Sequence, residues 1–359
     1  MQILVYVYII VAVITFTGLE FIDFLGHRKE NEARDEHYYD PKVLVIIPCK
    51  GIDLDLDKNL SSIAKQKEVR YDTVAVVDSE DDIAINSIKK AGINHIVAGS
   101  ICTRCSGKVK AISTAIEQLR EYDVYVIADS DIRVDRLWLR LLIDPLKNKK
   151  IGLSTMFPYF KPTGGFWSVT KCVWGFVGDS MMESQLTRFG WGGSLAFRRG
   201  LLDPKSMKFF KDSRYSVSDD ICLTKIAKEK GLKIAYTKEH RPVVNVRESA
   251  SSFIEWANRQ TALTVMSNRK TLRYGLLYYG SETLVLLSGI VLAISVSPIF
   301  IIMLIHLGRS IFLNYKRARF KSLTIALITI AMPMLYLISL VAASRIRSIT
   351  WRGRIYKLG

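Results

Sequence analysis

The sequence predicts an α/β domain on a mostly parallel sheet, with membrane helices before and after it. Residues 41 to about 270 alternate short β-branched runs with longer helical patterns, which is typical of βα units on such a sheet. Outside that region, three stretches carry no Asp, Glu, Lys or Arg, at residues 1–19, 283–308 and 322–344. Because about 20 apolar residues in a helix cross a bilayer, each stretch is long enough to be a membrane span.

The elements of the sheet are predicted in order along the chain. Short apolar runs predict strands at residues 43–47, 73–77, 95–97 and 124–128. Helical patterns around them predict helices at residues 59–67, 84–91 and 108–122. Pro48, Asp78 and Asp129 directly follow three of the strands. In open α/β sheets ligands bind beyond the carboxyl ends of the strands, so we expect a binding site there.

The first uncharged stretch predicts an uncleaved membrane anchor over residues 1–24. It has neither basic residues before its apolar run nor the small-residue cleavage site of a secretory signal. Arg28 and Lys29 follow it as the first basic residues. Because basic residues favour the cytosolic side of a span, the positive-inside rule places residues 41–270 in the cytosol. A buried core helix is the alternative interpretation for a stretch of this length.

A C-terminal membrane region is expected over residues 274–345, followed by a basic tail at 346–359. Basic residues lie both between its two uncharged stretches and after them. Two simple spans would place one of these basic clusters outside, against the positive-inside bias. A helix break at Ser297-Pro298 that makes one short helix re-entrant or interfacial avoids this, and so does an amphipathic segment on the headgroups around residues 309–321. The sequence leaves both arrangements open.

The net charge of +17 favours a membrane surface over nucleic acid as a partner. Residues 271–359 hold 11 basic residues and one acidic residue, and this stretch is also the most apolar part of the chain. Residues 1–270 hold 40 basic and 33 acidic residues, so the predicted soluble domain is nearly balanced and contains no recognisable nucleic-acid module. Basic residues beside apolar helices are typical of contact with anionic lipid headgroups.

The five cysteines are an odd number, which argues against a fully paired disulfide scaffold. Cys102 and Cys105 form a C-x-x-C pair, with no second pair and no His pair nearby in the sequence to complete a zinc site. In a cytosolic domain we expect reduced structural thiols at these positions, rather than a metal or redox centre.

Acidic residues at the strand ends carry the predicted chemistry. Asp78 can accept hydrogen bonds from a nucleotide base or ribose, as acids at strand ends do in nucleotide-binding folds. Asp129 and Asp131 stand two residues apart after a strand and can converge on one divalent cation. Mg²⁺ or Mn²⁺ suits such oxygen ligands and bridges a diphosphate. Asp219 and Asp220 precede a helical segment, where both are N-cap candidates and Asp220 is a candidate general base.

Further motifs stand in order between residue 48 and the C-terminus. They are Pro-Cys-Lys-Gly-Ile-Asp at 48–53, Lys-Val at 108–109, Ile-Ala-Asp-Ser-Asp-Ile-Arg-Val at 127–134, Gly-Gly-Ser-Leu-Ala-Phe-Arg-Arg at 192–199, Trp-Ala-Asn-Arg-Gln at 256–260 and Ile-Thr-Trp-Arg-Gly-Arg-Ile-Tyr at 349–356. With Asp78 and Asp220, they resemble the motifs of the ceramide glucosyltransferase family, glycosyltransferase family 21 within the wider family 2 group. The chain departs from that pattern at 256–260, where the family has (Gln/Arg)-x-x-Arg-Trp and only Arg259 is kept.

The resemblance implies a GT-A fold and an inverting glycosyltransferase that moves a sugar from a nucleotide-diphosphate donor, UDP-glucose or similar, to a membrane-lipid hydroxyl. It implies that Asp220 is the catalytic base and that Arg259 binds the diphosphate leaving group. It further implies donor contacts from Pro48, Lys50, Asp78, Lys108, Asp129 and Arg259, a Mg²⁺ or Mn²⁺ site at Asp129 and Asp131, and a sugar and acceptor side at Gly192, Gly193 and Ser194. The tail at 349–356 is expected close to the active site.

Other functions stay open at this point. A polyprenyl-phosphate glycosyltransferase needs no strong base, because its acceptor phosphate is already ionised. A polysaccharide synthase would be expected to have an intact Gln-x-x-Arg-Trp motif and more membrane spans. An inactive membrane protein that binds a sugar nucleotide or lipid is a further alternative. The presence of all three aspartates of the family motifs argues against it.

Overall fold

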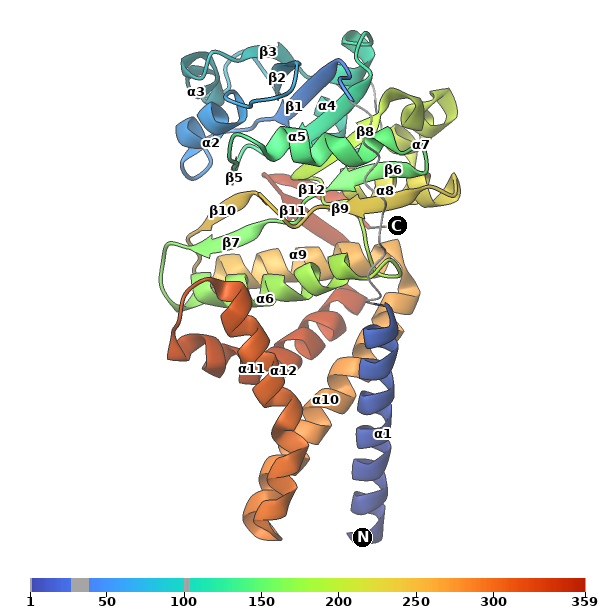
Figure 1. Cartoon of the computed structure of the whole chain (residues 1–359), viewed down its shortest axis with the longest axis vertical. Coiled ribbons are helices and arrows are strands. Elements are labelled where there is room, and N and C mark those ends of the chain that lie inside the picture. Colours follow the sequence, from blue (N-terminus) through green and yellow to red (C-terminus); the bar gives the residue numbers. More distant parts are fainter. Residues whose placement is uncertain (1, 27–38, 100–101, 103, 359) are drawn as a thin grey trace. The chain divides into compact units, whose positions relative to one another are not determined.

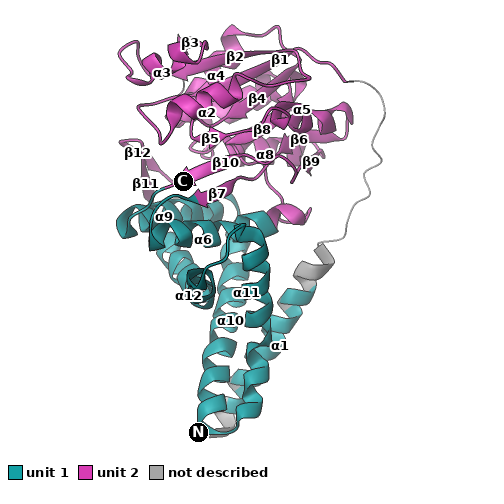
Figure 2. Cartoon of the chain, turned by 60° about the vertical axis from the view of Figure 1, so that its left-hand side comes forward, with its two compact units in different colours: residues 1–29, 162–180, 247–347 teal, residues 30–161, 181–246, 348–359 magenta. Residues whose placement is uncertain are grey.

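The structure is a computed structural model that describes residues 2–26, 39–99, 102 and 104–358. The chain forms two compact units, coloured separately in Figure 2. Unit 1 comprises residues 1–29, 162–180 and 247–347, and unit 2 comprises residues 30–161, 181–246 and 348–359. Residues 162–180 and 247–270, which were expected in the soluble domain, therefore group with the apolar helices, and the C-terminal tail groups with the sheet.

Unit 2 is built on a seven-stranded sheet with the strand order β3-β2-β1-β4-β8-β6-β9 (Figure 1). Its strands are β1 (Val43–Pro48), β2 (Tyr71–Val77), β3 (Asn94–Val97), β4 (Val124–Ala128), β6 (Ile151–Thr155), β8 (Ser194–Arg198) and β9 (Lys233–Tyr236). Strands β3, β2, β1 and β4 are parallel neighbours, β6 is parallel to β9, and β8 runs antiparallel between β4 and β6. The predicted α/β fold with a mostly parallel sheet is confirmed.

Short helices connect the strands of unit 2. They are α2 (Leu56–Ile63), α3 (Ala84–Lys90), α4 (Gly107–Gln118), α5 (Trp138–Ile143), α7 (Pro204–Asp212) and α8 (Asp219–Glu229), with 3₁₀ turns η1 (Asp144–Lys147) and η2 (Arg199–Leu202). Helix α4 begins where the Ser106 hydroxyl accepts a 3.2 Å hydrogen bond from Val109 N, which satisfies a backbone donor of its first turn. It ends at Gln118, before the predicted residue 122, and beyond this end the Leu119 carbonyl accepts a hydrogen bond from the Tyr125 hydroxyl.

Helices α4, α7 and α8 cover one face of this sheet. Successive strand residues point to opposite faces, and those on the helix side form a single buried cluster with the helices. Among its members are Leu44, Ile46, Val74, Val76, Ile112, Tyr125, Ile127, Phe210 and Leu223. Burying a side chain of this size stabilises the fold by about 1.5–3 kcal/mol. The packing fixes the first turns of α4 and α8 relative to the strands.

Two smaller sheets complete unit 2. The first has the order β5-β10-β7, with β5 (Ile132–Arg133), β7 (Tyr159–Pro162) and β10 (Val243–Val246). The second is a C-terminal hairpin of β11 (Ser348–Trp351) and β12 (Arg354–Lys357). Its turn residues Arg352 and Gly353 have φ angles of +50° and +74°, the left-handed conformation of tight hairpin turns. Glycine adopts it readily, whereas for Arg352 it costs about 1–2 kcal/mol.

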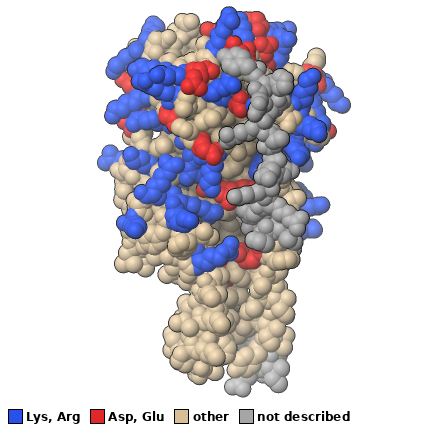
Figure 3. All heavy atoms as spheres, viewed as in Figure 1, with Lys and Arg blue, Asp and Glu red and all other residues tan. Residues whose placement is uncertain are grey.

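Unit 1 is helical. Its helices are α1 (Gln2–Gly26), α6 (Phe166–Glu183, the last three residues of which belong to unit 2), α9 (Ala250–Ser267), α10 (Arg269–Ser295), η3 (Pro298–Leu304), α11 (Ile305–Ala318) and α12 (Leu323–Arg345). Within the described residues, three helical stretches are long and apolar enough to cross a membrane, and they are Arg269–Ser295, Pro298–Ala318 and Leu323–Arg345. Figure 3 shows no Lys, Arg, Asp or Glu among the described residues on the visible face at the lower end of the view.

The helix breaks at Ser297-Pro298, as one of the two arrangements left open by the sequence requires, and the re-entrant or interfacial placement of a short helix stays a prediction. Helix α10 ends at Ser295, and the Ser297 hydroxyl accepts a 3.4 Å hydrogen bond from Ile299 N at the start of η3. Proline suits the next position, because a first-turn residue has no intrahelical partner for its N–H. The η3 segment then packs against α10, where a Cβ on Gly289 would lie 2.9 Å from Leu304 Cδ2. Arg28 and Lys29, on which the predicted orientation rests, lie outside the described residues.

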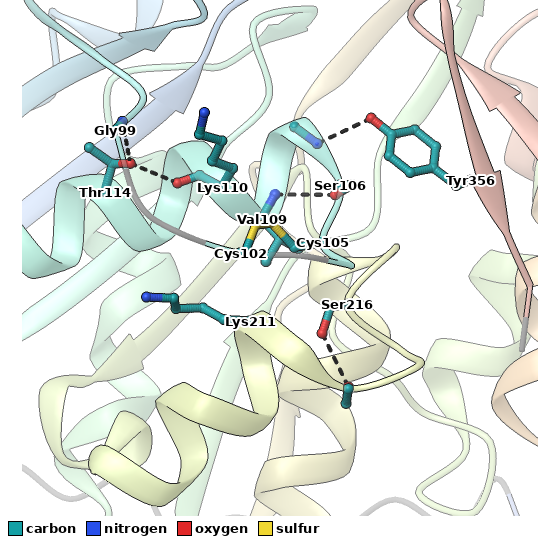
Figure 4. Close-up of a disulfide and its surroundings, with 12 residues drawn as sticks. Gly99, Cys102, Cys105, Ser106, Val109, Lys110, Thr114, Lys211, Ser216 and Tyr356 are labelled. Carbon is teal, nitrogen blue, oxygen red and sulfur yellow. Dashed lines mark hydrogen bonds between the residues drawn. A yellow bond between two sulfur atoms is a disulfide. The ribbon is translucent and has the colours of Figure 1, made fainter.

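The cysteine pair of the C-x-x-C motif is oxidised, so the expectation of reduced thiols at these two positions is wrong. Cys102 and Cys105 form a disulfide ahead of α4, with their Cα atoms 5.7 Å apart (Figure 4). That separation lies in the ordinary range for a disulfide, and the sequence spacing alone does not reveal it. Cys49 and Cys222 are buried thiols, and burial raises the pKa of each to about 12.

Candidate active site

The parallel strands bring the predicted donor residues to one edge of the sheet. Pro48 ends β1, Asp78 follows β2 and Asp129 follows β4, and these three strands are neighbours. Lys50 lies two residues after β1, and its Nζ is 3.1 Å from Asp78 Oδ2. The order of the strands therefore places side chains from three loops at the position where ligands bind in open α/β sheets.

Lys108 connects this edge to helix α8. Its Nζ lies 2.7 Å from Asp129 Oδ1 and 3.3 Å from Asp219 Oδ2. The lysine and Asp219 are almost fully buried, with side-chain exposures of 11% and 4%. Burial alone would lower the pKa of the Lys108 ammonium, but the two carboxylates raise it above its ordinary value, so the group stays charged. One buried cation thus compensates two carboxylates.

Asp219 is the partner in this arrangement that the sequence did not single out. It was expected to be at most an N-cap, but Ser218 is the N-cap residue of α8 and the Asp219 carboxylate turns to Lys108 instead. Burial raises the pKa of Asp219 well above its ordinary value, and Lys108 opposes that shift. From the sequence, either of the two adjacent aspartates could be the buried one. Only the packing of α8 decides that the Asp219 carboxylate is buried beside Lys108.

Asp220 occupies the first turn of α8. Its Oδ1 accepts a hydrogen bond from Ile221 N at 2.8 Å and another from the Ser218 hydroxyl. A carboxylate at this end of a helix is stabilised by the helix dipole. Asp220 is partly exposed, unlike its neighbour Asp219. The structure therefore places Asp220 beside the Lys108–Asp219 pair, with its carboxylate oriented by the helix terminus.

The glycine segment approaches the same pair. A Cβ on Gly192 would lie 2.3 Å from Asp219 Oδ2 and 3.0 Å from Lys108 Nζ, so only glycine fits at this position. The Gly193 carbonyl accepts a 3.1 Å hydrogen bond from Asp129 N. Ser194 is different, because its buried hydroxyl accepts a 2.8 Å hydrogen bond from Trp138 Nε1 within the core. Its predicted role on the sugar and acceptor side stays a prediction.

The turn that carries Asp129 and Asp131 is held by two residues from the loop and helix after β1. Asn59 Nδ2 donates a 3.2 Å hydrogen bond to the buried Ser130 carbonyl, and the Ser130 hydroxyl donates a 2.6 Å hydrogen bond to Asp53 Oδ2. Asp53 belongs to the motif at residues 48–53, but no role was predicted for it from the sequence. These bonds orient the turn from which both predicted metal ligands extend.

The chemistry of this donor set fits a magnesium or manganese ion. Two carboxylates suit a cation that completes its shell with water and substrate phosphates. Within the described part of the chain, no group of three or more His, Cys, Asp and Glu side chains is arranged to hold a metal. The metal-binding role of Asp129 and Asp131 stays a prediction. The cluster also favours a cation electrostatically, because the charges of Asp53, Asp131 and Asp129 raise the pKa of Arg352 against the effect of its burial.

The C-terminal hairpin reaches the edge of the sheet, as expected of the tail. Arg352 NH2 is 2.5 Å from Asp53 Oδ1, and Arg354 NH2 is 3.0 Å from Asp78 Oδ2. The Tyr356 hydroxyl accepts a 3.2 Å hydrogen bond from Gly107 N at the start of α4 (Figure 4). Sequence reasoning expected the tail nearby but assigned these three side chains no partners.

Arg259 lies on α9 in unit 1. Helix α9 begins at a capping box formed by Ser249 and Ser252. Trp256, one turn before Arg259, packs edge-on against Trp174 of α6 with ring centroids 4.9 Å apart. The predicted contact between Arg259 and a diphosphate stays a prediction, and Trp256 serves the packing of unit 1.

The fold and this edge define a GT-A type glycosyltransferase. The family model of glycosyl transferase family 21 matches residues 4–359, so the chain belongs to that family. Among solved structures, it is similar to the mannosyltransferase PcManGT from Pyrobaculum calidifontis, in complex with GDP-Man and Mn²⁺, at 15% identity and a TM-score of 0.60 over 95% of this chain and 97% of that chain. It is also similar to glucosyl-3-phosphoglycerate synthase from Mycobacterium tuberculosis, in complex with Mg²⁺ and UDP, at 15% identity and a TM-score of 0.44 over 63% of this chain and 79% of that chain.

Proposed function

We propose that this glycosyltransferase moves a sugar from UDP-glucose or a similar nucleotide-diphosphate donor to a hydroxyl of a membrane lipid, with inversion at the anomeric carbon. The observation that carries the proposal is the pairing of Lys108 with Asp129 and with Asp219 in the first turn of α8, in a family 21 chain. Three helical stretches long and apolar enough to cross a membrane support a lipid acceptor. They also support an integral membrane location, for which we propose that unit 2 faces the cytoplasm.

In the proposed mechanism, Asp220 Oδ2 takes the proton of the acceptor hydroxyl. The hydroxyl oxygen forms its bond to the anomeric carbon while the bond from that carbon to the diphosphate breaks, and the diphosphate leaves with the electron pair. The hydrogen bonds from Ile221 N and Ser218 hold the Asp220 carboxylate in place during this transfer. A positioned base contributes about 10²- to 10⁴-fold to the rate.

On the donor side, Asp78 accepts a hydrogen bond from the base or ribose, and Lys50 lies beside it. Pro48 places the backbone of the loop after β1 against the nucleotide. Asp129 and Asp131 would hold Mg²⁺ or Mn²⁺, which supplies Lewis-acid neutralisation of the leaving diphosphate. The Mn²⁺ in the structure of PcManGT supports this assignment. Lys108 keeps Asp129 oriented, and Arg259 pairs with the diphosphate.

The substrate test uses the full chain in detergent micelles with a panel of UDP-sugars and a lipid extract, and identifies the product by mass spectrometry. We expect one glycolipid, whose anomeric configuration is opposite to that of the donor. No lipid product from any sugar nucleotide would contradict the proposal. A product on a lipid phosphate would replace the hydroxyl acceptor with a polyprenyl phosphate.

The base is tested with Asp220→Asn. This change keeps the size of the side chain and removes its basicity, so transfer should fall about 10²- to 10⁴-fold while UDP binding measured by calorimetry stays nearly unchanged. Asp212→Asn is the matched control, because Asp212 ends α7 and is exposed. Turnover in Asp220→Asn equal to that of the control would rule out Asp220 as the base.

A further inference from the structure

The C-terminal hairpin places two arginines on the carboxylates of the donor edge. Arg352 NH2 lies 2.5 Å from Asp53 Oδ1, and its NH1 donates a 3.2 Å hydrogen bond to the Lys50 carbonyl. Arg354 NH2 lies 3.0 Å from Asp78 Oδ2, the same oxygen that Lys50 Nζ approaches to 3.1 Å. Residues from the last strand pair of the chain therefore occupy the site that the first two parallel strands form.

The hairpin is built for this close approach. Arg352 is in the left-handed backbone conformation, with φ at +50°. A non-glycine residue adopts this conformation at a cost in free energy, and strained residues of this kind cluster at functional sites. Gly107 provides the space opposite, because a Cβ there would lie 2.8 Å from Arg354 NH1. The Tyr356 hydroxyl adds a hydrogen bond from Gly107 N at 3.2 Å. These features hold the hairpin over the start of α4 as well as over the strand ends.

The charges explain what such a hairpin does at a nucleotide site. Residues 348–358 contain three basic residues and no acidic one. Arg352 compensates the charge of Asp53, and the charges of Asp131 and Asp129 act on Arg352 as well. A diphosphate bound beside Asp129 and Asp131 would bring negative charge to the same place. Arginine pairs with phosphate oxygens through two parallel N–H donors, which makes it well suited to that exchange.

We propose that the hairpin is part of the donor site, in which Arg352 binds the diphosphate and Arg354 gives up Asp78 to the nucleoside. This inference rests on the proposed function, because it assigns residues to the nucleotide that the enzyme uses. Arg352 exchanges the Asp53 carboxylate for phosphate oxygens when the donor binds. Arg354 leaves Asp78, whose carboxylate then accepts a hydrogen bond from the base or ribose. The hairpin thus contributes one arginine to the diphosphate and leaves one carboxylate to the nucleoside.

The two arginines should therefore respond differently to substitution. Arg352→Ala removes a charge-assisted contact to phosphate, so UDP binding in the presence of Mg²⁺ should weaken about 10- to 100-fold, whereas uridine binding should change little. Arg354→Ala removes the guanidinium that competes with the nucleoside for the Asp78 carboxylate, so uridine affinity should be unchanged or higher. A purely structural role of the hairpin would weaken both ligands in both variants. Arg352→Lys, which keeps the charge and loses the fork, should restore part of the UDP affinity.

The test measures UDP and GDP by titration calorimetry and uridine by ligand-observed NMR, on the full chain in detergent. Lys357→Ala is the matched control, since Lys357 is an exposed cation of the same hairpin. We expect UDP affinity of Lys357→Ala within about twofold of that of the unchanged protein, the range of ordinary surface substitutions. If the unchanged protein binds UDP but Arg352→Ala binds it equally well or more tightly, the hairpin assignment is wrong and the proposed function stands. If the unchanged protein binds neither UDP nor GDP, both are wrong.

Discussion

Lys108 is the residue on which the charge balance of the candidate site depends. Its ammonium group lies between Asp129, which follows β4, and Asp219, which begins α8. Both Lys108 and Asp219 are nearly inaccessible to water, so solvent stabilises neither charge and each depends on its ion-pair partner. Removing one partner of a buried ion pair costs about 3–5 kcal/mol, since the other charge stays buried.

We therefore predict that Lys108→Met lowers the midpoint of thermal unfolding and abolishes transfer. Lys110→Met is the control, because Lys110 is on the same helix and its ammonium group is in none of the ion pairs of this site. The double change Lys108→Met and Asp219→Asn should recover part of the lost stability, since the buried carboxylate becomes a neutral amide. Equal stability of Lys108→Met and Lys110→Met would show that the pair is not buried as described. Thermal unfolding followed by intrinsic fluorescence measures each midpoint.

Gly192 gives a second prediction at the scale of one residue. A Cβ on Gly192 would lie 2.3 Å from Asp219 Oδ2, and the buried ion pair with Lys108 prevents that carboxylate from moving away easily. Overpacking of this kind costs about 1–3 kcal/mol. If the cost falls on the catalytic geometry, Gly192→Ala lowers the initial rate of transfer about 10- to 100-fold.

Gly200→Ala is the control for that change, because a Cβ there meets no atom within 4 Å. Its rate should stay within about twofold of that of the unchanged enzyme, as for ordinary surface substitutions. Initial rates for the three proteins decide the matter. A rate for Gly192→Ala equal to that for Gly200→Ala would contradict the close approach of the glycine segment to Asp219.

At the scale of elements, the first four strands of the main sheet were predicted, whereas β6, β8, β9 and the exact helix ends were not. The run Val124–Ala128 stands between Asp123 and Asp129, so local polarity marks both ends of β4. No such mark stands at the end of α4, and just beyond it the Leu119 carbonyl accepts a hydrogen bond from the Tyr125 hydroxyl in the folded protein. A contact of that kind is tertiary, and no pattern in the helix sequence contains it.

The same distinction applies to the candidate site. Asp78 and Asp129 were predictable, because an acid directly after an apolar run comes to the carboxyl edge of a parallel sheet. The burial of Asp219 was not, because it depends on Lys108, which lies more than 100 positions earlier in the sequence. The partners of Arg352 and Arg354 could not be predicted for the same reason, since Asp53 and Asp78 lie on loops almost 300 residues earlier in the sequence. Sequence motifs identify residue types, and the fold selects their partners.

At the scale of the whole molecule, the grouping of α6 and α9 with the apolar helices could not be derived from hydropathy. Neither helix contains a long uncharged stretch, and their place in unit 1 depends on a few contacts between distant residues. Trp174 of α6 packs against Trp256 of α9, and the Tyr336 hydroxyl of α12 donates a 2.7 Å hydrogen bond to the Trp174 carbonyl. Aromatic rings with a polar contact are typical of the boundary between lipid and water. Unit 1 therefore combines helices that contain long uncharged stretches with two helices, α6 and α9, that do not.

The way in which the whole chain is held at a membrane gives the last prediction. If the apolar helices of unit 1 span the bilayer, the full chain stays in the membrane fraction after washes with about 1 M NaCl, where screening acts over only about 3 Å, and with alkaline carbonate. Basic residues alone would contribute about 1 kcal/mol each, and salt would remove that contribution. The matched variant Lys321→Gln, Arg345→Gln and Arg347→Gln loses three exposed cations of unit 1 and keeps every apolar helix, so it should stay in the pellet as well. Release of either protein into the salt wash, followed by immunoblotting, would mean that charge rather than apolar helices attaches the enzyme to its lipid surface.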